Sequence, residues 1–261
     1  MKKIGIVGCG VIGSSIAEFI SKKLKGRGKL VALADIDTEK AKRLSKKISS
    51  HPSVTDLETL MKISDLIVEA ANPKVSSLVI QKAVKAKKDA LIMSTGGALK
   101  HLSLLKKAKL LGINIYIPSG AICGLDGLKA ASIGKVTKVG ITTRKPPKGL
   151  IGAPYFIEKG IDISSIKKET VVFSGTALEA IKHFPKNVNV SATLSILGIG
   201  PKKTRVNIVT SPEYTSNTHE VEVEGDFGKF SVRCQNVPSK ENPKTSQLAI
   251  YSAQSMLKEI V

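Results

Sequence analysis

The sequence predicts an α/β protein in two parts: an N-terminal domain built on a doubly wound parallel sheet, and a C-terminal α+β domain with a mainly antiparallel sheet. In the first 118 residues, short apolar strand patterns alternate with amphipathic helix patterns. The glycine-rich segment GCGVIG directly follows the first strand pattern. After Pro118 the strand patterns lengthen and alternate apolar with polar residues, which is typical of antiparallel sheets with one solvated face.

The first domain is expected to span residues 1–118. Asp37 is a suitable N-cap for its second helix, and Asn72 followed by Pro73 is a suitable start for its third. Regular alternation of strands and helices indicates a parallel sheet covered by helices on both faces. Strands are predicted at 2–8, 29–35, 65–71, 90–95 and 113–119, and helices at 12–25, 38–48, 73–87 and 99–111.

The second domain is expected to span residues 119–242. Its last two strands are joined by the hairpin-type turn DFG. An amphipathic helix predicted at 243–261 is expected to return and pack on the first domain. The other strands and helices of this domain are predicted at 135–146, 204–212, 219–225 and 229–237, and at 125–133, 176–184 and 188–197, respectively.

Composition restricts the class of protein. No apolar run reaches the ~20 residues that span a membrane. The net charge of +20 comes mainly from lysines scattered over several predicted helices, without a nucleic-acid-binding motif and with no Trp. We therefore expect a solvated lysine surface, and neither nucleic acid nor membrane as a partner. Cys9, Cys123 and Cys234 lie far apart and lack metal-ligand spacing, which indicates a reduced cytoplasmic compartment and no metal site.

The segment GCGVIG carries the most specific local signal of the N-terminal half. It follows a strand, opens a helix and lies in a βαβ unit of the length expected for a Rossmann domain. Its glycines permit a tight turn, close approach of a pyrophosphate and close packing of helix on strand, while the first helical turn offers N–H donors. The predicted dinucleotide-binding residues in this segment are Gly8, Gly10, Val11, Ile12 and Gly13.

Asp35 ends the next predicted strand, 22 positions after Gly13, close to the ~20 usual for an acid that binds a ribose. Its carboxylate favours NAD, because it would repel the 2′-phosphate of NADP. Arg27, Lys29 and Lys40 are near in sequence and can offset that repulsion, so NADP stays open.

The segment SNTHEVEVEG alternates like a strand. Glu220, Glu222 and Glu224 should lie on a solvated face, whereas His219 shares the opposite, packed face with Val221 and Val223. The pattern leaves two interpretations of His219. It is either a buried hydrogen-bonding residue or a residue that moves protons.

In their order and spacing, GCGVIG with Asp35, SGAICGLDGLKAA, FPKNVNVSATLSILG and NTHEVEVEG resemble the archaeal-type L-aspartate dehydrogenases. The resemblance covers nearly the whole chain. More distantly, the layout resembles homoserine dehydrogenase and dihydrodipicolinate reductase. The closer resemblance implies NAD(P)-dependent oxidation of L-aspartate to iminoaspartate, which feeds quinolinate and NAD biosynthesis or hydrolyses to oxaloacetate and ammonia.

The same resemblance implies roles for three matching positions. Ala121 is expected to contact the cofactor through its backbone, Asn187 to contact it near the nicotinamide, and His219 to be the catalytic residue. Asn189 is the alternative to Asn187 at the ring, or else it caps the following helix. For His219, deprotonation of the amine and activation of the water that attacks the imine both remain open.

A dicarboxylate substrate requires cationic or N–H-rich partners, and the segment TTRKPPKGLIG is a candidate loop at the mouth of its site. We further expect a homodimer formed through the sheet of the second domain, whose open face needs covering. The alternatives are another dehydrogenase or reductase of this layout, and a non-enzymatic NAD-binding or nucleic-acid-binding protein. The candidate substrate-binding cations are Arg144, Lys145, Lys202, Lys203 and Arg233.

Overall fold

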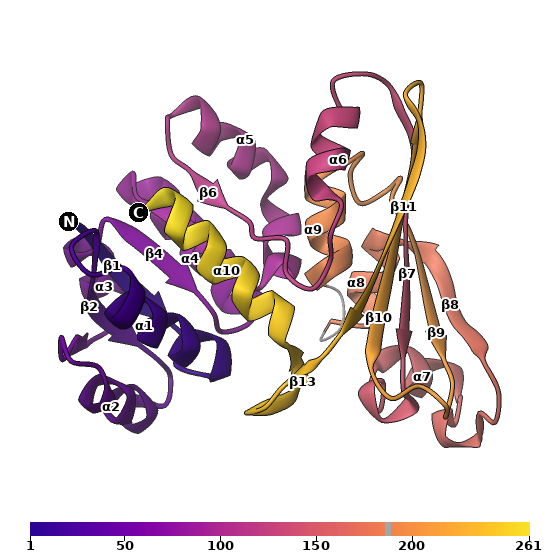
Figure 1. The fold of residues 1–261 in the computed structure, drawn as a ribbon, viewed down its shortest axis with the longest axis horizontal. Coiled ribbons are helices and arrows are strands. Elements are labelled where there is room, and N and C mark those ends of the chain that lie inside the picture. Colours follow the sequence, from indigo (N-terminus) through magenta and orange to yellow (C-terminus); the bar gives the residue numbers. More distant parts are fainter. Residues whose placement is uncertain (186–188) are drawn as a thin grey trace. The chain divides into compact units, whose positions relative to one another are not determined.

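The chain folds into two compact units (Figure 1). The structure, a computed structural model, describes residues 1–185 and 189–261. Unit 1 comprises Met1–Pro118 and Ile250–Val261, and unit 2 comprises Ser119–Ala249. Within the described residues, no helix is long and apolar enough to cross a membrane.

Unit 1 is built on the parallel sheet that the sequence predicts. Its strand order is β3-β2-β1-β4-β5-β6, and every pairing is parallel. The order reverses direction between β1 and β4, which is the arrangement of a Rossmann sheet, and ligands bind at the carboxyl ends of the strands at that point. The strands are β1 (Lys2–Val7), β2 (Gly28–Ala34), β3 (Ser53–Val54), β4 (Leu66–Glu69), β5 (Asp89–Ile92) and β6 (Ile115–Tyr116).

Capping side chains set where two helices of this unit begin, as predicted. The Asp37 carboxylate accepts a hydrogen bond from the backbone N–H of Lys40, and the Asn72 side chain accepts from those of Lys74 and Val75. The sequence analysis missed β3 and α3, which are short. The helices are α1 (Val11–Lys23), α2 (Thr38–Lys47), α3 (Leu57–Ile63), α4 (Pro73–Ala86) and α5 (Leu102–Leu110).

The helix predicted at 99–111 begins later than expected. Residues Thr95–His101 form a 3₁₀ helix, η1, and α5 follows it. This 3₁₀ segment packs closely on α4, because a Cβ atom at Gly97 would lie 2.1 Å from the carbonyl oxygen of Pro73. Position 97 therefore has no room for a side chain.

Helices cover both faces of the parallel sheet, as predicted. Ile4 and Ile6 of β1 are fully buried in a cluster that includes residues of α1 and α2. Gly5, between them, faces the other way, where a Cβ atom would meet the side chains of Leu60 and Ser64 at the end of α3. Ala253 and Leu257 of α10 (Gln247–Ile260) belong to the same cluster as Ile4.

Unit 2 contains a five-stranded sheet with the order β11-β10-β7-β9-β8. Its pairings are antiparallel except for β7 with β9, so the predicted mainly antiparallel sheet is confirmed. Two elements of this unit, β8 and α7, were not predicted from the sequence. The elements are β7 (Val136–Lys145), β8 (Thr170–Thr176), β9 (Arg205–Thr210), β10 (Asn217–Gly225), β11 (Gly228–Asn236), α6 (Leu125–Ala131), α7 (Pro154–Lys159), α8 (Ala177–His183), α9 (Asn189–Leu197) and the 3₁₀ turns η2 (Pro147–Gly149) and η3 (Ile163–Ser165).

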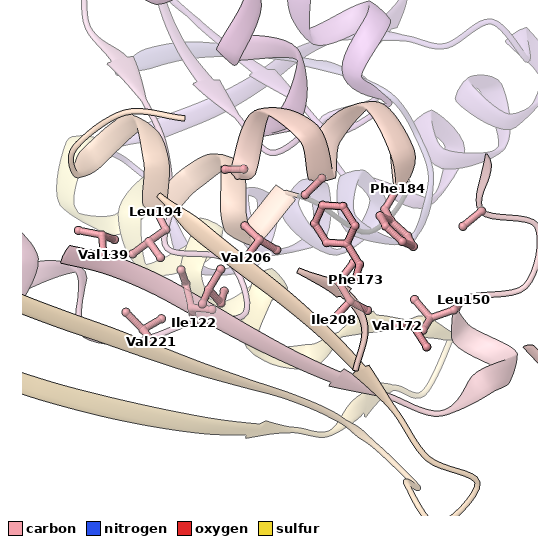
Figure 2. Packing of buried hydrophobic residues seen from close by; sticks show 14 of the residues in the cluster. Ile122, Val139, Leu150, Val172, Phe173, Phe184, Leu194, Val206, Ile208 and Val221 are labelled. Carbon is pink, nitrogen blue, oxygen red and sulfur yellow. The ribbon is translucent and has the colours of Figure 1, made fainter. Parts of the chain in front are cut away.

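One face of this sheet packs against helices and forms the core of unit 2 (Figure 2). Val221 of β10 and Val206 of β9 are buried beside Leu194 of α9, while Phe173 and Phe184 pack edge to face at 5.2 Å between ring centroids. Val221 and Val223 lie on the packed face as the alternating pattern predicts. The position of His219 on that same face follows from the two-residue period.

The prediction of a helix at 243–261 is wrong for its first residues. Asn242–Ser246 instead form strand β13, which pairs antiparallel with β12 (Pro238–Ser239). The Ser246 hydroxyl donates to the side-chain oxygen of Asn236, and the backbone N–H of Gln247 donates to the carbonyl of Val237. These hairpin contacts hold the segment extended, so α10 begins only at Gln247.

Candidate active site

The glycine-rich turn between β1 and α1 has the geometry that its three glycines require. Gly8 adopts φ +99°, and a Cβ atom there would lie 2.6 Å from the carbonyl oxygen of Ala70. At Gly13 a Cβ atom would lie 1.9 Å from the carbonyl oxygen of Gly8, so only glycine fits. At Gly10 a Cβ atom would meet no neighbouring group within 4 Å among the residues that the structure describes, and the residue supplies no side-chain cap to α1. The turn is therefore tight on the inside and open on the outside.

A pocket of about 430 Å³ opens beside this turn, which we call the dinucleotide pocket. Gly8, Gly10 and Asp35, which the sequence analysis named together, all line it. Val11, Ile12 and Gly13 begin α1 directly after Gly10, with Val11 and Ile12 half-buried and Gly13 buried. The other lining residues are Val7, Ala34, Ile36, Lys40, Thr55, Asp56, Leu57, Ala70, Ala71, Asn72, Val75 and Leu78.

Asp35 is held in place by backbone donors. Its Oδ2 atom accepts from the N–H of Cys9 at 2.6 Å, and its Oδ1 atom accepts from the N–H of Asp37 at 2.9 Å. These bonds fix the carboxylate at the end of β2, at one wall of the dinucleotide pocket. Burial, with a smaller contribution from the charge of Asp35, raises the pKa of the Cys9 thiol to about 12. Cys9 is therefore an inert structural thiol.

Glu69, in the same unit, is a fully buried carboxylate whose role the sequence analysis did not identify. Its two oxygens accept from the backbone N–H of Ala71 at 2.8 Å and of Ser94 at 3.0 Å. Burial raises its pKa. Glu69 thereby links the turns that follow β4 and β5, next to the dinucleotide pocket lined by Ala71. The one sequence signal for this role was an acidic residue near the end of the strand predicted at 65–71.

His219 lies on β10 with 4% of its surface exposed. Its Nδ1 atom is 3.0 Å from the hydroxyl oxygen of Thr143 on the neighbouring strand β7. Burial, and to a lesser extent the positive charge of Lys145, lower the pKa of His219 from 6.5 to about 3. The imidazole is therefore neutral at neutral pH, and a ring held through Nδ1 exchanges protons with a ligand only through Nε2.

A second pocket, of about 330 Å³, lies in unit 2 and we call it the Lys145 pocket. Its walls are the loop after β7 and the residues before His219. The segment TTRKPPKGLIG, expected at the mouth of a substrate site, does border a cavity. The full lining is Lys145, Pro146, Lys148, Gly149, Thr215, Ser216, Asn217 and Pro238.

Strand register places His219 and the Lys145 pocket on one face of the sheet. His219 is opposite Thr143, and Thr218 is opposite Arg144. Because side chains alternate along a strand, Lys145 shares the face of Thr143. Asn217 shares the face of His219 for the same reason. Burial lowers the pKa of Lys145 from 10.5 to about 8.

The other candidate substrate cations lie elsewhere. Arg144 is on the opposite face of the sheet, where its guanidinium donates to the Glu220 carboxylate at 2.7 Å. Lys202, Lys203 and Arg233 are exposed, and none of them lines the Lys145 pocket. Thr143 and Lys148 lie within the segment TTRKPPKGLIG but were not singled out from the sequence, and neither was Asn217. The pairing of Thr143 with His219 depends on a register between residues 76 positions apart, which a sequence does not display.

Two cofactor positions inferred from the resemblance have different outcomes. Ala121 is buried in unit 2, and its carbonyl oxygen accepts from the Asn236 side-chain amide at 3.0 Å. Asn187 lies outside the described residues. Asn189 is the first residue of α9.

Unit 1 is a Rossmann unit with a glycine-lined dinucleotide pocket, and unit 2 contains a buried histidine near a lysine-lined pocket. These features define a nicotinamide-dependent dehydrogenase. Family models match both parts: "Homoserine dehydrogenase, NAD binding domain" over residues 8–118, and "Aspartate dehydrogenase, C-terminal" over residues 126–260. The chain belongs to the L-aspartate dehydrogenase family.

Relatives support this membership along the full length. The chain is 46% identical to an L-aspartate dehydrogenase of Methanosarcina acetivorans, covering 100% of this chain and 97% of the relative. It is 38% identical to an L-aspartate dehydrogenase of Bradyrhizobium diazoefficiens, over 98% and 91% of the two chains. The crystal structure of an aspartate dehydrogenase from Thermotoga maritima superposes with a TM-score of 0.74 at 28% identity, covering 100% of this chain and 97% of that one.

Proposed function

We propose that this protein oxidises L-aspartate to iminoaspartate and transfers the hydride to a nicotinamide dinucleotide. The observation that carries the proposal is the full-length identity of 46% to an L-aspartate dehydrogenase. The buried histidine and the lysine-lined pocket of unit 2 fit that reaction, because the substrate carries one amine and two carboxylates. Iminoaspartate then supplies quinolinate and NAD biosynthesis, or hydrolyses to oxaloacetate and ammonia.

The residues of unit 1 fit a dinucleotide. Gly10 leaves open space where a pyrophosphate approaches, and the N–H groups of Val11, Ile12 and Gly13 stand at the positive end of α1. Asp35 accepts ribose hydroxyls with a carboxylate that backbone donors already orient. The resemblance adds a backbone contact at Ala121 and a contact near the nicotinamide at Asn187.

NAD is the preferred cofactor in this proposal. The carboxylate of Asp35 repels a 2′-phosphate, and it cannot turn away without losing the bonds from Cys9 and Asp37. Lys40 lines the same pocket and provides one positive charge that partly compensates. Slower but measurable turnover with NADP is therefore expected.

His219 is the proton-transferring residue of the proposed reaction. The bound dinucleotide supplies the hydride acceptor. Before the hydride leaves the α-carbon, the substrate ammonium must lose a proton, and Nε2 of His219 is the nitrogen that can take it. A dicarboxylate bound nearby brings negative charge, which raises the pKa of His219 from its value in the unliganded protein and makes it a better base. Activation of water by the same nitrogen is the alternative step.

The test is formation of reduced nicotinamide by the purified protein with L-aspartate and either NAD or NADP. L-homoserine is assayed in parallel as an alternative substrate, because the N-terminal half matches the model of a homoserine dehydrogenase NAD-binding domain. L-glutamate and L-alanine complete the set. Rapid reduction with L-aspartate alone supports the proposal. Tight NAD binding without reduction by any of these amino acids refutes it.

We also propose that the protein is a homodimer formed through the five-stranded sheet of unit 2. The face of β7 and β10 opposite the core carries alternating charges, including Lys138, Arg144, Glu220 and Glu224. Such a face suits a polar interface that weakens as salt rises. Sedimentation at low and high ionic strength tests this, and a monomer under both conditions refutes it.

A further inference from the structure

We propose that the Lys145 ammonium binds the side-chain carboxylate of the substrate and thereby makes the site selective for dicarboxylic over monocarboxylic amino acids. This inference rests on the proposed function, and it identifies which of the candidate cations performs the recognition. Its basis is the geometry of one face of the sheet in unit 2.

The first step is the position of Lys145. It ends β7 two residues after Thr143, which holds the Nδ1 atom of His219. Residues two apart on one strand face the same way and stand roughly 7 Å apart. Lys145 therefore stands about that far along the strand from Thr143, the partner of His219. A small amino acid and a lysine side chain together are long enough to bridge this spacing. The positive charge of Lys145 also contributes, after burial, to the lowered pKa of His219.

The second step is the direction of the cavity. The Lys145 pocket lies beyond the His219–Thr143 pair along the strands, because its walls come from the segment after Thr143, the segment before His219 and one further residue. These lining residues are Lys145, Pro146, Lys148 and Gly149, then Thr215, Ser216 and Asn217, and Pro238. If the substrate amine is at His219, the part of the substrate that enters this cavity is the side chain. The pocket volume of about 330 Å³ admits either aspartate or glutamate, so Lys145 selects charge and not length.

The third step is the chemistry of the lining. Lys145 is only partly exposed and lies inside the pocket, whereas Lys148 is exposed. Thr215, Ser216 and Asn217 add polar groups but no charge. A substrate carboxylate that enters this pocket meets the Lys145 ammonium at its wall, and a charge-assisted hydrogen bond between the two is stronger inside a pocket than in bulk water. Burial lowers the pKa of Lys145, which makes its ammonium a stronger acid, and a carboxylate bound beside it would stabilise the charged form.

The experiment compares two ligands of similar shape, succinate and butanoate, which share one carboxylate and differ in the second. Binding of each to the NAD-loaded protein is measured by calorimetry for the parent and for Lys145→Met. We expect the variant to bind succinate about 10- to 100-fold more weakly and butanoate nearly unchanged. The kcat/KM for L-aspartate should fall by a similar factor, and Lys145→Arg should restore part of the succinate affinity.

Matched variants separate position from charge. Lys138→Met removes the same charge from the same strand, but on the opposite face, where Lys138 pairs with Glu224. That variant should leave the ratio of succinate to butanoate affinity within about threefold of the parent. Lys148→Met removes a charge at the exposed rim of the pocket and shows whether the rim lysine performs the recognition instead. If Lys145→Met does not fold, Lys145→Gln replaces it.

Three results would overturn the inference. Equal loss of succinate and butanoate binding means that Lys145 binds the carboxylate common to both ligands. No loss of either means that it binds neither. Loss of selectivity in Lys148→Met and not in Lys145→Met assigns the role to the rim lysine. Failure of the parent protein to oxidise L-aspartate would refute the proposed function separately, because the binding measurement does not depend on turnover.

Discussion

The Nδ1 atom of His219 and the hydroxyl oxygen of Thr143 lie 3.0 Å apart across the pairing of β10 with β7. Both side chains are buried, so this contact is the described bond that fixes the orientation of the imidazole. A ring with a fixed orientation presents Nε2 in one direction. The function of His219 therefore depends on a residue that no motif includes.

Replacement of Thr143 by valine should impair turnover more than folding. Valine keeps the volume but removes the hydroxyl, which leaves Nδ1 of a buried ring without its partner, at a cost of roughly 1–3 kcal/mol. We expect kcat with L-aspartate to fall about tenfold or more while NAD affinity stays unchanged. Steady-state kinetics and NAD titration measure this. Thr143→Ser is the control and should retain most activity; equal losses in both variants would contradict the orienting role.

His219→Ala should keep cofactor binding and lose turnover. Removing a group that transfers a proton typically lowers the rate about 10²- to 10⁴-fold. NAD titration and pre-steady-state reduction with L-aspartate distinguish binding from chemistry. A variant that turns over aspartate at near the parent rate would mean that His219 is a structural residue, which the buried bond to Thr143 alone would also explain.

The sequence predicted what depends on local chemistry. The GCGVIG turn, the caps Asp37 and Asn72, and the burial of Val221 and Val223 all follow from short-range patterns. The register between strands that are distant in the sequence could not be predicted from such patterns. The partnership of His219 with Thr143, and the entry of Lys145 into a pocket with Asn217, depend on which strands become neighbours.

Short or unusual elements were also missed for physical reasons. β3 has two residues and α3 has seven, too few to display a period. The strand Asn242–Ser246 has the polar composition of a helix start, but the hairpin with β12 and the bond from Ser246 to Asn236 hold it extended. Tertiary pairing thus overrode a local preference.

The two glycines of the N-terminal turn should respond differently to a methyl group. Gly13→Ala places Cβ 1.9 Å from a backbone oxygen, so the turn must distort and both thermal stability and NAD affinity should fall. In Gly10→Ala the new methyl group meets no neighbouring group within 4 Å in the described part of the chain, so stability should hold. NAD affinity should fall, because the methyl group occupies the space of the pyrophosphate. Thermal unfolding with and without NAD measures both; unchanged NAD affinity in Gly10→Ala would contradict the placement of the pyrophosphate.

Asp35→Asn should shift cofactor preference toward NADP. The amide keeps one acceptor for the backbone N–H of Cys9 or Asp37 but removes the charge that repels a 2′-phosphate, and Lys40 remains in the pocket. We expect the ratio of kcat/KM values for NADP and NAD to rise about tenfold, which corresponds to roughly 1.4 kcal/mol. Measurement of both cofactors at saturating L-aspartate tests this. A ratio that does not move would assign discrimination to other residues of the pocket.

Lys145→Met should make the protein more stable at neutral pH while it weakens substrate binding. In the unfolded chain Lys145 keeps its proton up to a pKa of 10.5, but in the folded protein burial lowers that pKa to about 8. Between these values the unfolded state binds more protons, so the free energy of unfolding of the parent rises with pH. Below about pH 8 the parent carries the full cost of burying the ammonium, about 3 kcal/mol, and above pH 10.5 it carries none.

The stability advantage of Lys145→Met over the parent should therefore be largest below pH 8 and should shrink as pH rises toward 10.5. Urea unfolding of both proteins at pH 7, 9 and 10.5 without substrate measures the difference. Succinate should reduce the advantage at pH 7, because a bound carboxylate compensates the buried charge in the parent alone. A variant that is less stable than the parent at pH 7 would contradict a net free-energy cost of burying the Lys145 ammonium.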